Sequence, residues 1–430
     1  MKNSNSLGRI KFYMNRLRER LWVKPLAVCA LSILGAFLAG LADQATYSVA
    51  IPDISAESIE TLLSIMSASM LVIAVFTVGA MLSAYTSVSN TATPRAFSLV
   101  IADDVSQNAL STFIGAFIFS IIALVALMNG YYEKPGRFAL FLLTVAVLAI
   151  VILGFVRWVD RIARLGRLGT TIEKVEEATA SALTARAQHP TLGAKQTNGD
   201  ETGLPVYAST VGYVQRVDLS NLQAWAERVD LNLTVISPPG TFVSTSQPLA
   251  LVMGAKHDLD MSGIINAFVV AKERTFDEDP RFGLLVLSEI ASRALSPAVN
   301  DPGTAIDILD TFVRLFTGWA HTVEKRQESP VKFSKVAMPE VLPKEMLNDA
   351  FNAIARDGSG MLEVALRLQK ALQALSFLRS AELQDAAVGR AQYALRHSEL
   401  MLKLQDEIEE LQQSAIWIAM TEANHLSLER

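Results

Sequence analysis

Four long apolar runs near the start of the chain constrain its fold more than any other feature. They lie at about 24–42, 60–84, 109–128 and 138–156. A helix needs about 20 mostly apolar residues to cross a bilayer, and each run is close to that length. Apolar residues make up 51% of the 430-residue chain. The sequence therefore predicts an α-helical membrane domain of four transmembrane helices at 24–168.

Lysine and arginine residues are distributed unequally around these runs. The segment 1–23 is a basic tail, and Arg157, Arg161 and Arg164 follow the fourth run, whereas the loop at 43–59 contains no lysine or arginine. Because cytoplasmic loops carry the excess of basic residues, we predict that both termini are cytoplasmic. The three arginines recur at helical spacing and would form a basic stripe under the membrane. This stripe would anchor the chain to anionic lipid or, in an oligomer, line the inner mouth of a pore.

The second run differs from the others because it is rich in small and hydroxylated residues. Its hydroxyl residues include Ser64, Ser67, Thr77, Ser83 and Ser87. One interpretation is close packing between helices, for which membrane proteins use small residues. The other is that these side chains line a pore. Packing is the favoured interpretation, and the helical pattern of this run continues past the membrane to about Thr91.

The chain changes character after the membrane runs. The segment 169–204 predicts a helix, to about Gln188, and then a polar linker. The segment 205–256 predicts a small β-rich subdomain. Its expected elements are strands at 206–217 and 231–236 with a helix at 219–228 between them. The run at 240–250 resembles the hairpin of biotinyl and lipoyl-like barrels, but no lysine at its tip could hold a cofactor, so we predict a barrel-like structural hairpin and no cofactor.

The remaining segment, 257–430, is expected to be mainly helical and completes an α+β cytoplasmic domain. Apolar residues before Ser296 recur at helical spacing and predict a buried helix. That helix should end at Ser296, because the residue before a proline is disfavoured in the helical region. Asp301 and Pro302 should start the next helix as its cap and first residue. The result is a helix, a tight corner and a second helix.

Further elements follow this corner. On its second helix, Asp310 and Arg314 are four residues apart and are expected to pair. A strand is predicted at 331–336 and a helix at 343–356. From Met361 to the end the pattern is helical, with a spacing near the end that suits a coiled coil or a hairpin.

A set of polar residues around the corner is the candidate site. Its members are Arg274, Asp279, Arg293, Asn300 and Asp301. Charged groups in an apolar setting need partners, because unpaired buried charges are costly. We favour a structural role in which these residues pair and cap helices. The alternative is a ligand- or anion-binding pocket assisted by helix amide groups.

The usual signatures of catalysis and of metal binding are absent from the sequence. There is no P-loop, dinucleotide fingerprint or His-Glu-x-x-His motif. The histidines show no metal spacing, so no metal site is expected. They are His189, His257, His321, His397 and His425. These absences lower the expectation of an enzyme without excluding one, and the net charge of −5 weakly disfavours a nucleic acid partner.

Several stretches together carry a family resemblance. They are Arg274-Thr275 with Asp279-Pro280, RALSPAVNDPGTA at 293–305, Ala92-Thr93-Pro94-Arg95, and GYVQRVDLSNLQAWAERVDLNLTVISPPGTFVSTSQPLALV at 212–252. The chain resembles an uncharacterised family of bacterial predicted membrane proteins, known only as a domain of unknown function. In this chain, Asn90 to Thr93 replaces the family's usual Gln-Phe-Ser before the Pro-Arg pair. The resemblance implies a fold and a location in the bacterial cytoplasmic (inner) membrane, and it implies no activity.

Two functional hypotheses follow from the sequence. The first, which the sequence favours, is a homo-oligomeric channel or transport-related protein with a cytoplasmic regulatory domain, acting on an unidentified small solute or ion. The second is a membrane-tethered sensor or scaffold whose cytoplasmic domain binds a ligand or a protein partner. In both, the lipid bilayer is a partner.

Overall fold

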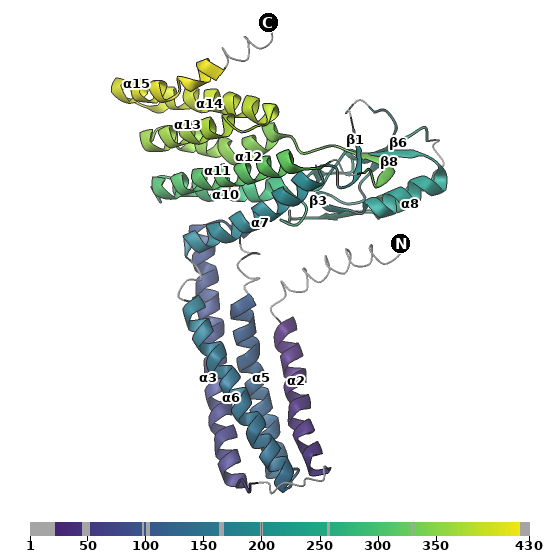
Figure 1. Ribbon diagram of the computed structural model, residues 1–430, viewed down its shortest axis with the longest axis vertical. Helices are drawn as coiled ribbons and strands as arrows, with labels where there is room; N and C mark the ends of the chain where they lie inside the picture. The colour runs from purple at the N-terminus through teal and green to yellow at the C-terminus, as the bar shows by residue number, and fades with distance from the viewer. Residues whose placement is uncertain are drawn as a thin grey trace. The chain divides into compact units, whose positions relative to one another are not determined.

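The computed structural model describes residues 22–44, 52–96, 99, 104–162, 167–197, 199, 201–255, 259–327 and 330–421. The chain divides into two compact units, Met1–Thr171 and Ile172–Arg430 (Figure 1).

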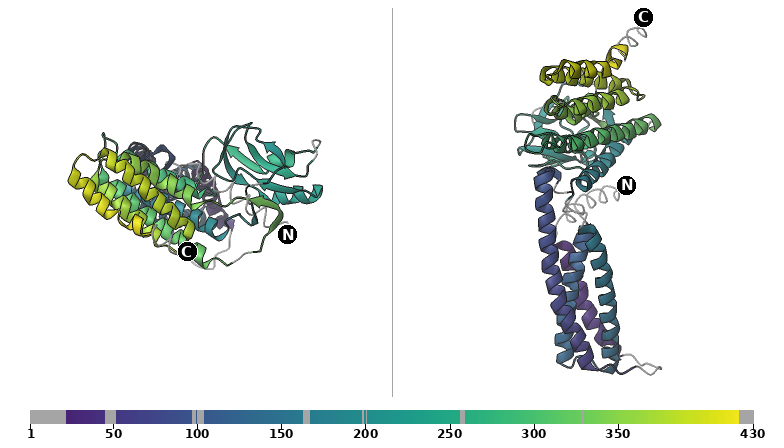
Figure 2. Two further views of the ribbon diagram at one scale, coloured as in Figure 1. Left: turned by 90° about the horizontal axis from the view of Figure 1, so that it is seen from above. Right: turned by 90° about the vertical axis from the view of Figure 1, so that its left-hand side faces the viewer.

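The first unit is built from long helices that lie side by side (Figures 1 and 2). They are α2 (Val23–Ala39), α3 (Ala56–Thr91), α5 (Asp104–Met128) and α6 (Lys134–Ile162), with short 3₁₀ turns η1 (Gly40–Gln44) and η2 (Pro94–Ala96). Within the described residues, four helical segments are long and apolar enough to cross a membrane. These segments are Val23–Asp43, Ala56–Asn90, Val105–Met128 and Lys134–Ile162. The four predicted transmembrane runs are therefore confirmed as apolar helices.

Helix α5 lies at the centre of this unit and packs against α2, α3 and α6. Its Phe113 is fully buried, and the ring of Phe113 meets the buried ring of Trp158 on α6 at a centroid distance of 6.4 Å. At the other end of α6, the Asp43 carboxylate accepts hydrogen bonds from the backbone N–H groups of Glu133 and Gly136, at 3.1 and 2.6 Å. Asp43 therefore ties η1 to the start of α6.

Helix α3 is the longest helix of the first unit. Its 36 residues correspond to about 54 Å at the usual helical rise of about 1.5 Å per residue. The hydrocarbon core of a bilayer is only about 30 Å thick. The helix reaches Thr91, so the prediction that it continues beyond a membrane-spanning length is confirmed.

The second unit begins within α7 (Leu168–Gln188) and continues into a β-rich part. The elements of this part are β1 (Ala194–Gln196), β2 (Leu204–Tyr207), β3 (Gly212–Val217), α8 (Leu219–Val229), β4 (Asn232–Val235), β5 (Phe242–Val243), β6 (Pro248–Met253), α9 (Ser262–Ile265), β7 (Phe268–Ala271) and, later in the chain, β8 (Phe333–Met338). One sheet has the order β1-β8-β4-β6-β2, and β8 is parallel to both of its neighbours. The other sheet has the antiparallel order β5-β3-β7.

The expectation of a barrel-like hairpin at 240–250 was wrong. Strand β5 pairs with β3, whereas β6 pairs with β2 and β4 in the other sheet, so the two strands never pair with each other. The predicted strand at 206–217 is likewise two strands, one in each sheet. Both sheets are open. The reason is that strand partners are selected over long sequence distances, while the hairpin prediction used only neighbouring residues.

Helices form the rest of the second unit and stack in layers beside the sheets (Figures 1 and 2). They are α10 (Pro280–Ala294), α11 (Pro302–Lys325), α12 (Pro343–Asp357), α13 (Leu362–Ser376), α14 (Ala381–Met401) and α15 (Gln405–Ser414). Phe351 of α12 packs against Phe312 and Phe316 of α11, with centroid distances of 5.2 and 6.2 Å. The predicted α+β architecture with a helical part is confirmed.

The C-terminal segment is not a coiled coil. A break after Met401 separates α14 from α15, and Met401 and Leu404 are exposed while Leu411 is fully buried. The spacing that suggested a coiled coil is therefore divided between two separate helices.

Candidate functional site

The five polar residues around the predicted corner lie in two places, at opposite ends of α10. Arg274 and Asp279 lie at its start, whereas Arg293 is in its last turn and is followed by Asn300 and Asp301. A 15-residue helix spans about 22 Å. The set is therefore not a single cluster, and each end of the helix has its own polar contacts.

At the start of α10, Arg274 and Asp279 form a two-pronged ion pair. Arg274 Nε and Nη2 donate to the two carboxylate oxygens of Asp279 at 2.6 and 2.9 Å, and Asp279 is only 3% exposed. Asp279 also accepts the backbone N–H of Phe282 at 3.2 Å and thereby caps the helix. The Arg274 guanidinium lies 5.4 Å from the centre of the Phe282 ring.

A glycine makes room for this ion pair. Gly240 has φ +95, and a Cβ atom there would lie 2.6 Å from the carboxylate carbon of Asp279. The position therefore requires glycine both for its backbone conformation and for the close approach of the buried carboxylate. Gly240 lies in the turn between β4 and β5, so the start of α10 is locked onto the sheets.

At the other end of α10, Asp301 caps α11 as predicted. Its carboxylate accepts the backbone N–H of Thr304 at 3.1 Å and the Thr304 hydroxyl at 2.5 Å. Asn300 has φ +52, the left-handed region that asparagine tolerates better than most residues. Pro302 occupies the first turn of α11. The helix-capping chemistry of the corner is thus present, while ligand binding there stays a prediction.

The hydroxyl residues of α3 do not share one face. Ser64 and Ser83 are exposed, Ser67 and Ser87 are half-buried, and Thr77 is fully buried. The Thr77 hydroxyl donates to its own helix at Ile73 O, at 2.8 Å. A pore-lining role for the five side chains stays a prediction, and their scattered orientation does not favour it.

Of the predicted basic stripe, two members are described. Arg157 is exposed on α6, and Arg161 is half-buried in its last turn. Arg164 lies outside the described residues. The role of the stripe at the membrane surface stays a prediction.

The expected pair between Asp310 and Arg314 is not formed. Arg314 instead donates through Nε and Nη2 to Glu176 of α7, both at 2.8 Å, and Arg367 of α13 forms the ion pair with Asp310. Partners on neighbouring helices thus replace the partner on the same helix. These contacts fasten α7 and α13 to α11.

A second buried charged group lies where α7 ends. Arg186 is 5% exposed, and its guanidinium donates to the backbone oxygens of Glu278 and Pro190 at 2.9 and 3.4 Å. Burial lowers the pKa of Arg186 from its ordinary value, partly offset by the charges of Glu278 and Asp279. Burial likewise raises the pKa of Glu278 to about 7, although Arg216 lies 3.4 Å away.

A pocket of about 310 Å³ opens beside Arg186. Its lining comes from α7, α11, the connection between β8 and α12, and the starts of α10, α12 and α14. Its apolar lining includes Leu183, Pro280, Trp319, Val323, Pro343 and Met346. Its charged lining consists of Arg186, Arg326, Glu340 and Glu382.

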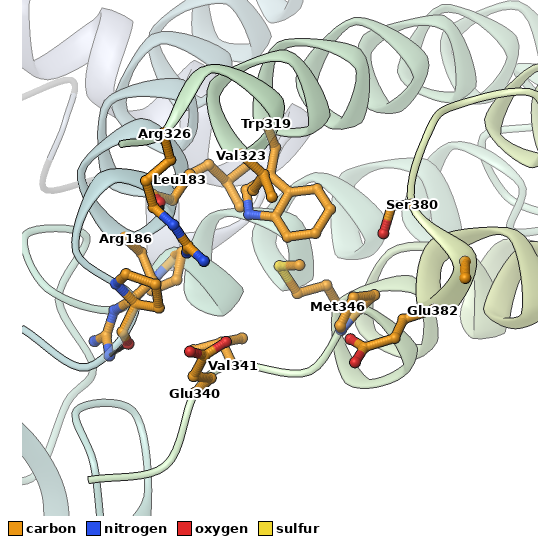
Figure 3. Close-up of a pocket in the computed structure, with 15 residues that line it drawn as sticks. Leu183, Arg186, Trp319, Val323, Arg326, Glu340, Val341, Met346, Ser380 and Glu382 are labelled. Atoms are coloured by element: carbon orange, nitrogen blue, oxygen red, sulfur yellow. Dashed lines mark hydrogen bonds between the residues drawn. The ribbon is translucent and has the colours of Figure 1, made fainter. Parts of the chain in front are cut away.

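The charged side chains of the pocket lie on different sides of it. In Figure 3, Arg186 and Arg326 lie together at one side and Glu382 at the other, with Trp319 and Met346 between them. The Arg326 guanidinium also donates to Ala187 O at 3.4 Å, near the end of α7. The volume of about 310 Å³ is at the lower end of the usual range for ligand pockets. A pocket of this size suits a small molecule.

Sequence reasoning did not find this pocket. Its residues are separated by as many as 199 positions, from Leu183 to Glu382, and no local motif connects them. The sequence did mark two helix starts that line the pocket, because a proline in the first turn indicates where a helix begins. These prolines are Pro280 and Pro343.

Comparison with known proteins gives a family and few near relatives. The family described as "Predicted membrane protein (DUF2254)" matches residues 18–374. The uncharacterized proteins MT1328 of Mycobacterium tuberculosis and Mb1321c of Mycobacterium bovis are each 31% identical over 112 residues, 25% of this chain. The match spans only 22% of the length of either relative. No solved structure matches the chain.

The family match covers most of the chain, including all four apolar helices and the sheets. It agrees with the resemblance inferred from the sequence, and it supports a location in a membrane. The chain therefore belongs to the DUF2254 family of predicted membrane proteins.

Proposed function

We propose that this protein is a membrane-tethered sensor, anchored in the bacterial cytoplasmic membrane, whose Ile172–Arg430 unit binds a small ligand. The observation that carries the proposal is the pocket of about 310 Å³ at Arg186. Its apolar lining and its charged side chains on two sides are the combination by which proteins bind and orient small molecules.

The pocket is well placed to transmit binding to the rest of the unit. Leu183, Arg186 and Ala187 belong to the last turns of α7, and Trp319 and Val323 belong to the last turns of α11. The same two helices are joined by the ion pair between Glu176 and Arg314. A ligand that contacts both helices would bias their relative position, which is what a sensor requires.

The proposal is tested by filling the pocket. Ala381 lines the pocket and is exposed, so Ala381→Trp should fold and occupy the cavity. Ala374→Trp is the matched control, because Ala374 is an exposed helical alanine outside the pocket. The full-length protein in detergent is melted with and without a small-molecule extract of bacterial cells.

We expect the extract to raise the melting temperature of the wild type and of Ala374→Trp but not of Ala381→Trp, because a ligand stabilises only the state that it binds. An equal effect on all three proteins, or no effect on any, would refute the sensor function of this pocket.

The orientation of the chain is part of the same proposal. The unequal distribution of lysine and arginine supports cytoplasmic termini. Reporter fusions at Ala56 and Tyr132 should report the periplasm, and fusions at Asn90 or Asn198 the cytoplasm. A cytoplasmic report at Ala56 would contradict the four-span topology.

A homo-oligomeric channel is the second candidate, and one observation favours assembly. The outer face of α3 presents Gly79, where a Cβ would meet nothing within 4 Å, together with exposed Ser64 and Ser83. Small residues on an open face allow helices of two copies to approach closely. Cysteine substitutions along 64–87, in a Cys29→Ala background, test it. Labelling by a water-soluble thiol reagent every three to four residues deep in the span would support a pore, and labelling at the ends alone would exclude one.

A further inference from the structure

The charged side chains of the pocket have one property in common. Within the part of the chain that the structure describes, Arg186, Arg326, Glu340 and Glu382 make no ion pair, either with one another or with other residues. Arg186 and Arg326 donate only to backbone oxygens. Arg186 lies in the field of Glu278 and Asp279, whose charges partly offset the lowering of its pKa by burial, but none of the four charged groups has an ion-pair partner among the described residues.

Their arrangement places the two arginines and Glu382 at opposite sides of the pocket (Figure 3). Glu340 lies below Arg326 in that view, on the side of the two arginines. A ligand with a negative group at one end and a positive group at the other would meet opposite charges at both ends. A simple anion would meet the arginines but would also face the glutamates.

The middle of the pocket is apolar. Trp319 is 9% exposed and Met346 is 1% exposed, and both lie between the charged ends in Figure 3. An indole ring and a thioether adapt to aliphatic and aromatic groups alike. The ligand should therefore carry apolar side chains that contact Trp319 and Met346.

We propose that this pocket binds a small linear zwitterion of the chemical class of apolar dipeptides, with its carboxylate at Arg186 and Arg326 and its amino group at Glu382. The inference rests on the proposed ligand-binding function and adds the chemistry of the ligand. The carboxylate can accept charge-assisted hydrogen bonds from the arginine side, which are among the stronger polar contacts in proteins. The ammonium group can donate to Glu382 at the rim.

The experiment measures the binding of four probes to the full-length protein by isothermal titration calorimetry. The probes are leucyl-leucine, its N-acetyl derivative, its C-terminal amide and free leucine. We expect leucyl-leucine to bind about tenfold more tightly than either blocked form, because each block removes one charged contact. Leucine should bind more weakly still, because its two charges are adjacent and cannot reach both sides.

Two variants test which charged side chain of the pocket binds each end of the ligand. Glu382→Gln should remove the preference for the free amino group, and Arg326→Gln should reduce the preference for the free carboxylate. Glu363→Gln is the matched control, because Glu363 occupies the first turn of α13 as Glu382 occupies that of α14. The control should retain both preferences.

The outcomes separate this inference from the function on which it rests. If the N-acetyl form binds as tightly as the free dipeptide, the pocket binds a plain anion and the zwitterion class is refuted. If no probe binds while the cell extract still stabilises the protein through the pocket, the class is refuted and the sensor function stands. If no probe binds and the extract does not stabilise the protein, both the zwitterion class and the sensor function are refuted.

Discussion

Asp279→Asn is the most informative change at the start of α10. Asparagine keeps the size of the side chain and an oxygen that can cap the helix, but it removes the charge that faces Arg274. Arg274 has a side-chain exposure of 15%, so its guanidinium would be left largely buried without a counter-charge. Removal of one partner from a buried ion pair costs about 3–5 kcal/mol. For a unit of this size that corresponds to a loss of about 6–20 °C in melting temperature.

Asp301→Ala is the comparison, because Asp301 caps α11 without an ion pair among the described contacts. A lost cap costs about 1 kcal/mol, or about 2–4 °C. Thermal melts of the full-length protein, followed by tryptophan fluorescence, measure both changes. The double variant Arg274→Gln with Asp279→Asn should recover most of the loss, since the Arg274 charge is then removed together with its partner. Equal losses for Asp279→Asn and Asp301→Ala, or no recovery in the double variant, would refute the reasoning.

Three further changes test the packing and the buried charge. Gly283→Ala should destabilise the protein by about 1–3 kcal/mol, because the new Cβ would overlap the hydroxyl of buried Thr179 and lie 2.8 Å from its Cβ. A melting temperature equal to that of the wild type would contradict the close packing of α7 on α10. Gly136→Ala should lower the melting temperature of the membrane helices, because the new Cβ would lie 2.8 Å from Asp43 Oδ1 and disturb the contact that ties η1 to α6. Glu278 has a pKa raised from 4.5 to about 7, so the folded state binds its proton more tightly than the unfolded state does. Its contribution to stability, at most about 3 kcal/mol, is complete below pH 4.5 and is lost as the pH rises through about 7. Glu278→Gln should therefore reduce the fall in melting temperature between pH 5 and 8. If the melting temperature of the variant falls as steeply with pH as that of the wild type, Glu278 is not the cause of the fall.

The sequence predicted those features that depend on neighbouring residues. The membrane helices were found because apolar length is a property of one continuous segment. The corner was found because Ser296 precedes a proline, and Asp301 and Pro302 together begin a helix. Each of these features is determined by residues that are close together in the sequence.

The features that the sequence missed depend on partners far along the chain. Arg314 binds Glu176, which is 138 residues away, although Asp310 lies four residues away on the same helix. Strand β5 joins β3 instead of the neighbouring β6. The pocket is assembled from distant segments of the second unit, so its charges could be identified only after the helices were placed.

The central claim is that the pocket at Arg186 holds a small ligand, and native mass spectrometry tests it most directly. The full-length wild type, Ala381→Trp and Ala374→Trp are incubated with the cell extract, separated from unbound material and measured. We expect one added small-molecule mass on the wild type and on Ala374→Trp, and none on Ala381→Trp. The same added mass on all three proteins, or none on the wild type, would contradict it.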